Sequence, residues 1–103
     1  MFNYKNYIST NITTNSMVYN PIGYSSTIIG FIVCNNTANS VNISVTIINN
    51  GVTANIASNV TISTGASLSV VDSNRIIVGD GNSIYVSSTG SVDVTISVIE
   101  VLS

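Results

Sequence analysis

The sequence predicts an all-β protein, an antiparallel β-sandwich of the Ig-like or jelly-roll kind, with about eight to ten short strands in a single domain over residues 1–103. Short segments of alternating apolar and polar residues recur along the chain, and Gly, Asn and Asp interrupt them, as expected for half-buried strands joined by tight turns. The third observation is negative: no stretch shows a helical i, i+3, i+4, i+7 stripe, and the abundant Val, Ile and Thr disfavour helix.

The first strand is expected over residues 2–13, with its apolar side chains on one face: Phe2, Tyr4, Ile8 and Ile12. After a turn at Asn15-Ser16, a short strand is expected over 17–19. Asn20-Pro21-Ile22-Gly23 then predicts another turn, since proline marks a place where no ladder donor is needed.

Residues 26–34 predict a strand that is apolar on both faces, which is typical of a strand in the centre of a sandwich or under a partner. Gly30, at its middle, indicates a bulge or a close backbone approach. Cys34 is the only cysteine, so no disulfide can form within one chain, and its apolar surroundings predict a buried, inert thiol.

Residues 41–47 alternate cleanly and predict a one-sided strand. The Asn50-Gly51 pair that follows predicts a tight hairpin, because both residues tolerate positive φ, and residues 52–56 should return antiparallel. The remaining strands are expected between the breaks at Gly65, Asp72-Ser73-Asn74 and Gly79-Asp80-Gly81; they span residues 60–63, 67–71, 76–78, 84–88 and 92–102.

The last strand contains an irregularity. Its apolar positions share one face as far as Val98, but the next position on that face is Glu100, while Ile99 and Val101 are apolar on the opposite face. Two interpretations are open: a bulge near Val98 changes the phase, or the last residues leave the core and pack elsewhere.

Charge is scarce: 6% of the residues are charged, the net charge is −2, and the only cations are Lys5 and Arg75. Two isolated cations cannot follow a phosphate backbone, so nucleic acid is not an expected partner. Apolar runs such as 28–34 are too short to span a membrane. Mean hydropathy is +0.49. A hydrophobic surface with so few charges gives little repulsion between copies, which predicts that the chain is part of an assembly, such as a homo-oligomer.

The sequence starts without an apolar leader segment, so no signal peptide is expected. Four N-x-[ST] sequons occur in this Asn-rich and Ser/Thr-rich chain, and without a leader they carry little weight; they begin at Asn11, Asn35, Asn42 and Asn59.

Catalytic chemistry is not apparent. The chain has no histidine, which excludes Cys-His and Ser-His-Asp sites within one chain. The four carboxylates, Asp72, Asp80, Asp93 and Glu100, are interpreted as solvated turn and strand residues and not as an acid pair. Calcium at Asp80 and Asn82 is conceivable but lacks EF-hand spacing. No enzyme activity, cofactor or metal is expected.

Four of the five tyrosines, Tyr4, Tyr7, Tyr19 and Tyr24, lie in the first quarter of the chain, and Tyr85 stands apart. Aromatic clusters pack against a sheet, anchor a protein partner or stack on a sugar. Ordinary packing is the favoured interpretation, a protein contact is second and sugar binding is third.

The strand-and-turn segments together resemble a known class. Those that carry the resemblance are T-I-I-G-F-I-V-C-N-N-T, V-N-I-S-V-T-I-I-N-N-G, V-T-I-S-T-G-A-S-L-S-V-V, G-D-G-N-S-I-Y-V-S-S and S-V-D-V-T-I-S-V-I-E-V. The chain resembles small all-β virion structural proteins of tailed bacteriophages, found as capsid decoration or cement proteins or as neck and tail components. It departs from the expected pattern at Ser63-Thr64-Gly65, where a Pro-Ala-Gly type of turn is usual.

The resemblance implies a non-enzymatic virion protein, assembled in the host cytoplasm, with other virion proteins as partners and no nucleic acid or membrane. We expect contact through apolar faces and strand edges, with residues 1–14 as an assembly-contacting strand. The expected contact residues are the aromatic N-terminal segment and the apolar tail: Phe2, Tyr4, Tyr7, Ile99, Val101 and Leu102. The alternative is a carbohydrate- or receptor-binding module of a neck, tail or fibre that uses Tyr24 or Tyr85.

Overall fold

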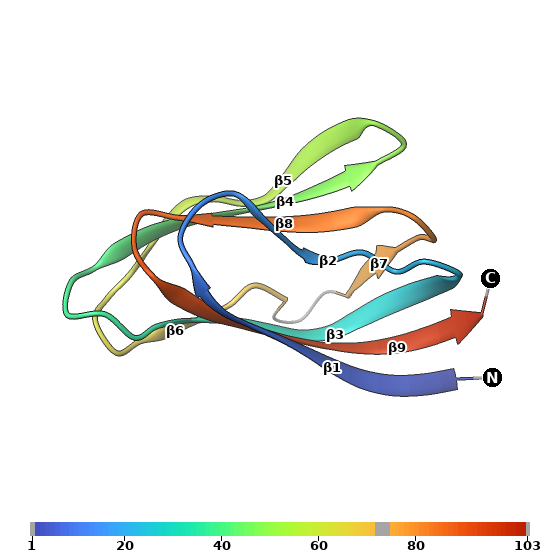
Figure 1. Ribbon diagram of the computed structural model, residues 1–103, viewed down its shortest axis with the longest axis horizontal. Helices are drawn as coiled ribbons and strands as arrows, with labels where there is room; N and C mark the ends of the chain where they lie inside the picture. The colour runs from blue at the N-terminus through green and yellow to red at the C-terminus, as the bar shows by residue number, and fades with distance from the viewer. Residues whose placement is uncertain (1, 72–74, 103) are drawn as a thin grey trace.

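The computed structural model describes residues 2–71 and 75–102 and, within them, shows nine β-strands and no helix, hence no helix that could cross a membrane. The strands lie in two antiparallel layers (Figure 1), which confirms the predicted all-β sandwich. Their bounds are β1 (Phe2–Ile12), β2 (Ser16–Tyr19), β3 (Tyr24–Asn35), β4 (Val41–Asn49), β5 (Val52–Ile62), β6 (Ser67–Ser69), β7 (Ile76–Val78), β8 (Ser83–Ser88) and β9 (Val92–Leu102).

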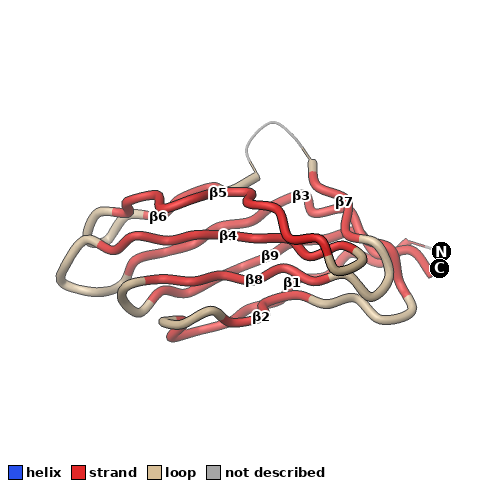
Figure 2. Tube along the Cα trace, turned by 90° about the horizontal axis from the view of Figure 1, so that it is seen from above, coloured by secondary structure: helices blue, strands red, loops and turns tan. Residues whose placement is uncertain are grey.

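The strand order is that of a jelly roll. Sheet A has the order β1-β9-β3-β6, with β7 also paired to β3, and sheet B has the order β2-β8-β4-β5. Figure 2 shows the four strands of sheet B side by side. β1 therefore pairs with β9, β2 pairs with β8, and β3 pairs with β6 and β7. β4 and β5 form the hairpin in the middle of the chain. A folded-over ribbon of this kind is the jelly-roll wrapping, so the structure selects it over the Ig-like alternative.

The core lies between the sheets and is built from the inward positions of each strand, as period-two alternation requires. Its fully buried members from sheet A include Ile28, Phe31, Val33, Val94 and Ile96, and those from sheet B include Ile43, Val45, Ile84 and Val86. Branched side chains fill most of this layer, and Phe31 is its largest apolar member.

A bulge in β3 confirms the prediction made from Gly30. The register with β9 shifts between Ile28 and Gly30, so Ile29 is the extra residue and the phase of the strand changes. Phe31 and Val33 therefore join Ile28 in the core, and Cys34 lies on the outer face and is only half-buried. The predicted burial of the thiol is wrong, because Cys34 lies on the same outer face as Ile32, which is 47% exposed.

β9 keeps its alternation to the end of the sheet. Its register with β1 is continuous from Ser97↔Asn6 to Val101↔Phe2, so no bulge interrupts β9 near Val98 and the tail does not leave the sheet. Both interpretations of the last strand are therefore wrong. The irregularity opposite Val98 lies in β3, and Glu100 points inward, in phase with the core residues before it.

β1 differs from its prediction in one respect. Its register with β9 shifts between Ser9 and Ile12, where Asn11 has a φ of 55°. This irregularity turns Ile12 toward the core, away from the face that carries Tyr4 and Ile8.

The predicted hairpin at Asn50-Gly51 is present: β4 and β5 pair up to Asn49↔Val52, and the two turn residues have φ of 52° and 80°. Its tip stands clear of the other strands in Figure 1. The strands expected over 52–56 and 60–63 are one strand, β5, which stays paired across register shifts near Ala57. The predicted break at residues 72–74 lies outside the described residues.

The turn geometry gives a stability prediction. Gly51→Ala places a Cβ at positive φ and should lower the free energy of unfolding by about 1 kcal/mol. Urea unfolding measures this change. Gly30→Ala is the control: its φ is not positive and its Cβ would make ordinary contact with Ser97 at 3.5 Å, so stability should be unchanged or slightly higher. Equal losses in both variants would contradict the turn argument.

Candidate functional site

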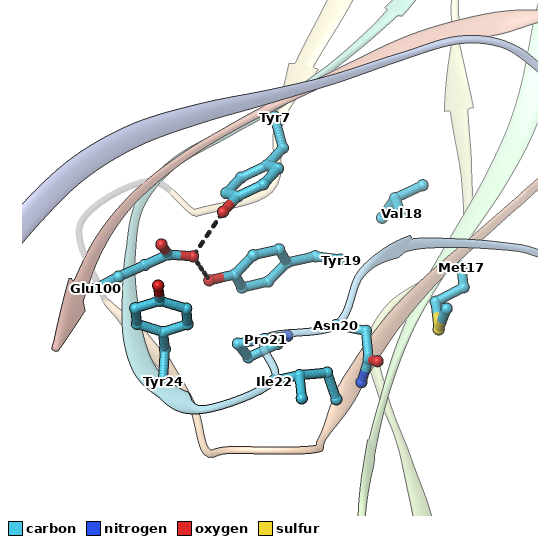
Figure 3. Close-up of a pocket in the computed structure, with 9 residues that line it drawn as sticks. All are labelled: Tyr7, Met17, Val18, Tyr19, Asn20, Pro21, Ile22, Tyr24 and Glu100. Carbon is cyan, nitrogen blue, oxygen red and sulfur yellow. Dashed lines mark hydrogen bonds between the residues drawn. The ribbon is translucent and has the colours of Figure 1, made fainter. Parts of the chain in front are cut away.

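The most unusual group inside the sandwich is the carboxylate of Glu100, which is 1% exposed. Its Oε2 accepts the hydroxyl of Tyr7 at 2.8 Å and that of Tyr19 at 2.7 Å (Figure 3). Tyr7 belongs to sheet A and Tyr19 to sheet B, so one oxygen fastens the two layers together. The Tyr19 hydroxyl also shares a hydrogen bond with Ser26 on β3. We call Glu100, Tyr7, Tyr19 and Ser26 the tyrosine–glutamate cluster.

The second carboxylate oxygen, Oε1, accepts no hydrogen bond in the described structure and faces the ammonium group of Lys5 at 3.7 Å. Lys5 is about half exposed, and its Nζ lies 5.8 Å from the ring centre of Tyr24. A lone buried carboxylate is costly, and this ion pair with two tyrosine hydroxyls supplies its compensation.

The two tyrosines are held in their protonated form. Burial, followed by the hydrogen bond to Glu100, raises the pKa of Tyr7 to about 12. The pKa of Tyr19 is also raised, chiefly by burial, although the Ser26 hydrogen bond opposes the rise. The rings are 5.0 Å apart between centres and tilted by 48°, so they also pack on each other. Both hydroxyls are therefore persistent donors and poor general bases at neutral pH.

A pocket of about 370 Å³ opens beside the cluster (Figure 3). Its lining is largely apolar and aromatic: Tyr7, Met17, Val18, Tyr19, Asn20, Pro21, Ile22, Tyr24 and Glu100. Glu100 is the only carboxylate among these lining residues, and both of its oxygens are directed at groups of the protein itself. The arrangement stabilises the junction of the sheets and offers no acid–base pair for hydrolysis.

The interpretation of the carboxylates as solvated is wrong for Glu100, whereas Asp80 is exposed and Asp93 is partly exposed. Glu100 is buried, and Asp93 accepts the Asn11 backbone N–H at 3.2 Å and the Asn36 side-chain amide at 2.8 Å. Asp80 accepts the backbone N–H of Gly23 at 2.8 Å. Asp72 lies outside the described residues.

The calcium interpretation gains no support from geometry. Across residues 2–71 and 75–102, no group of three or more Asp, Glu, Cys or His side chains could hold a metal. The carbonyl oxygen of Asn82 accepts the Asn20 side-chain amide at 2.7 Å, so this turn contributes to loop packing.

The structure brings most of the expected contact residues together at one end of sheet A. Phe2 pairs with Val101 and Tyr4 with Ile99 across β1 and β9. Tyr4, Ile99 and Val101 lie on the outer face, and the side chain of Phe2 is outside the described residues. The other two residues differ: Tyr7 points into the cluster, and Leu102, exposed, pairs with Tyr24 on the inward phase of the sheet.

Several exposed apolar residues were missed. Ile8 and Ile77 are 71% and 72% exposed on the outer face of sheet A, and Ile32 lies between them on β3. The apolar phase of Tyr4 and Ile8 was visible in the sequence. The sequence did not show that this face of β1 is exposed to solvent. Its exposure depends on Tyr7 and Lys5 pointing inward to Glu100.

Tyr24 and Tyr85, the tyrosines of the sugar-binding alternative, lie on different sheets. Tyr24 lines the pocket at the end of sheet A, whereas Tyr85 lies half-buried on sheet B, paired with Met17 and Thr46. The structure therefore does not bring them together as a stacking surface.

Comparisons with known proteins bear on the fold. No family model matches the chain, and no curated protein matches it. Among solved structures it is similar to a chain from work described as "Bacillus endospore appendages form a novel family of disulfide-linked pili". The TM-score is 0.52 at 12% identity, over 100% of this chain and 88% of the other. At this identity the likeness shows a shared all-β fold. The similar chain comes from a bacterial appendage and not from a phage particle.

The cluster predicts a measurable stability term. Tyr19→Phe removes a hydrogen bond to a buried carboxylate and should lower the free energy of unfolding by roughly 1.5–3 kcal/mol in urea titrations at pH 7. Tyr4→Phe is the matched control, because it removes the hydroxyl of an exposed tyrosine. Equal stability of the two variants would mean that the hydrogen bond from Tyr19 to Glu100 contributes nothing to the free energy of unfolding.

The raised pKa of Tyr7 predicts alkaline sensitivity. An unfolded tyrosine ionises near pH 10, whereas Tyr7 in the folded chain stays protonated to about pH 12. The unfolded state therefore loses its proton first, and stability should be fully present below pH 10 and fall as the pH rises through 12. Urea midpoints at pH 8, 10 and 11.5 measure this fall, which should be smaller in Tyr7→Phe. An identical pH dependence in that variant would contradict the assignment.

Proposed function

We propose that this protein is a non-enzymatic structural subunit of a multi-copy assembly, in which strand β1 adds to a sheet of a neighbouring subunit. The observation that carries the proposal is the open edge of β1 in sheet A: among the described residues β1 pairs with β9 on one side and with no strand on the other. A long, regular edge strand exposes unpaired backbone groups, and proteins that stay monomeric normally protect such edges.

The other edges of the sandwich are protected. In the described structure β2, β6 and β7 are four, three and three residues long. β5 is long, but its pairing shifts near Ala57, and Asn59 has a φ of 52°. β1 is regular from Phe2 to Ser9, and it has no proline. It is therefore the edge best suited to accept another strand.

Lys5 is the only charged residue of β1, and an inward-pointing lysine is one device that protects an edge. Here its ammonium group lies 3.7 Å from Glu100 of the same sheet. Its charge is thus paired within the subunit, and β1 presents no unpaired charge to an incoming strand.

Two particular assemblies agree with this proposal. The resemblance in the strand-and-turn segments favours a capsid decoration or cement protein of a tailed-phage virion, or a neck or tail component. The shared fold with the appendage chain makes a bacterial surface filament the second candidate. In either setting the contacts would centre on β1 and the end of β9, where Tyr4, Ile99 and Val101 lie.

The class of function is tested by quantitative mass spectrometry of purified particles or appendages from the source, counting this chain against the major subunit. A comparable copy number supports a decoration protein or filament subunit, and a much smaller one supports a neck or tail component. Absence from every such assembly would refute the proposal.

Hydrogen exchange tests the edge itself. Backbone N–H groups of β1 that point away from β9 should exchange freely in the isolated chain and about tenfold more slowly in the assembly, because each gains a backbone partner. β5 is the control edge and should be unchanged. Unaltered exchange in β1 after assembly would contradict strand addition. A deletion of residues 1–8 is a less clean test, since it also removes Lys5 and Tyr7 from Glu100.

A further inference from the structure

We propose that the outer face of sheet A is a second, separate interface, which packs face to face against the same face of a second copy of this chain. The inference rests on the proposed role as a subunit of a multi-copy assembly, and it adds a surface and a partner to the strand edge. The face comprises the outward positions of β1, β9, β3, β6 and β7, and no other strand of the described residues covers it in Figure 1.

The registers align the outward side chains in rows that cross the strands. One row runs through Tyr4, Ile99, Thr27 and Ile77, and another through Ile8, Thr95, Ile32 and Ser69. Each row contains large apolar side chains from at least two strands. They form two ridges on the surface of the sheet.

Between the ridges lies a row of smaller residues, Asn6, Ser97 and Gly30. A hollow of about 270 Å³ opens there, lined by Tyr4, Asn6, Ile29 and Ser97 together with the adjoining Lys5 and Val98. The Ser97 hydroxyl donates to the Asn6 side-chain oxygen at 2.7 Å, so these two side chains are linked by a hydrogen bond within the face. The hollow can receive a side chain from a partner's ridge, and the apolar part of its lining comes from Tyr4, Ile29 and Val98.

The exposed area is close to what a stable pair needs. Tyr4, Ile8, Ile29, Ile32 and Ile77 are 74%, 71%, 39%, 47% and 72% exposed. With roughly 200 Å² for each large side chain, they expose on the order of 600 Å², to which Ile99 and Val101 add their exposed parts. A standard interface buries about 800 Å² on each partner, and apolar patches of a few hundred Å² usually mark an interaction site.

The scarcity of charged side chains on this face indicates what kind of surface can pack against it. Among the described outward residues of the strands of sheet A the only charged side chain is Asp93, at the far end of β9, where Asn11 and Asn36 already bind it. The exposed Arg75 lies directly before β7, at the margin of the face. A charged partner surface would lose its hydration against these ridges without gaining a counter-charge. An equally apolar sheet face with charge only at its margins fits, and a second copy supplies it. Such a contact is isologous, and paired sheets of this kind pack about 10 Å apart.

Sedimentation velocity of the isolated full chain over a range of concentrations tests the proposal. The wild type should form dimers. Ile32→Lys, in the middle of the face and away from the β1 edge, should weaken dimerisation at least tenfold. Val52→Lys is the matched control, because Val52 is a 69% exposed apolar residue at the tip of the β4–β5 hairpin, and it should dimerise as the wild type does.

Gly30→Ala is the second variant. It adds a methyl group between the ridges, in ordinary contact with Ser97, which lines the hollow, so it should weaken the dimer while leaving the urea midpoint unchanged or slightly higher. A wild type that stays monomeric, or a dimer that survives both substitutions, would overturn the interface. A monomeric chain that is still abundant in purified assemblies, with β1 protected from exchange, would overturn only this inference. A face-dependent dimer that is absent from all assemblies would overturn the proposed function instead.

Discussion

The contacts of the buried Glu100 carboxylate are the interactions that tie β1 and the two sheets together. Its Oε2 binds a tyrosine from each sheet, and its Oε1 faces Lys5. These contacts draw the polar side chains of β1 inward and therefore turn Tyr4 and Ile8 outward. A slip of one residue would exchange the two faces of β1 and turn Tyr7 and Lys5 away from Glu100, so the cluster stabilises the register that leaves Tyr4 and Ile8 exposed.

Much of the fold was predictable because it depends on local patterns. The alternation of apolar residues located the strands, Asn50-Gly51 located the hairpin, and Gly30 located the bulge. The position of Glu100 was misjudged because a carboxylate in an apolar phase usually signals a break. Its burial depends on hydroxyl groups 93 and 81 residues away, and no local pattern reports such partners.

The candidate interfaces, too, were predictable from the sequence only in part. Pairing of the N-terminal segment with the tail followed from neither motif nor spacing, yet it places Tyr4 beside Ile99. Composition alone indicated an adhesive surface, and the structure divides that surface into an open edge and an apolar face. An edge adds copies within one sheet, whereas a face adds them across sheets. A subunit with both could join a neighbour through its edge and pair with a second copy through its face.

The jelly-roll wrapping also affects how the chain folds as it is synthesised. β9 lies between β1 and β3, so neither strand has its central neighbour until residues 92–102 have left the ribosome. β1 must wait, unpaired, through the synthesis of about eighty residues, and such distant pairings fold slowly. During that interval the apolar residues of the strands already synthesised are exposed, which favours pairing between nascent copies.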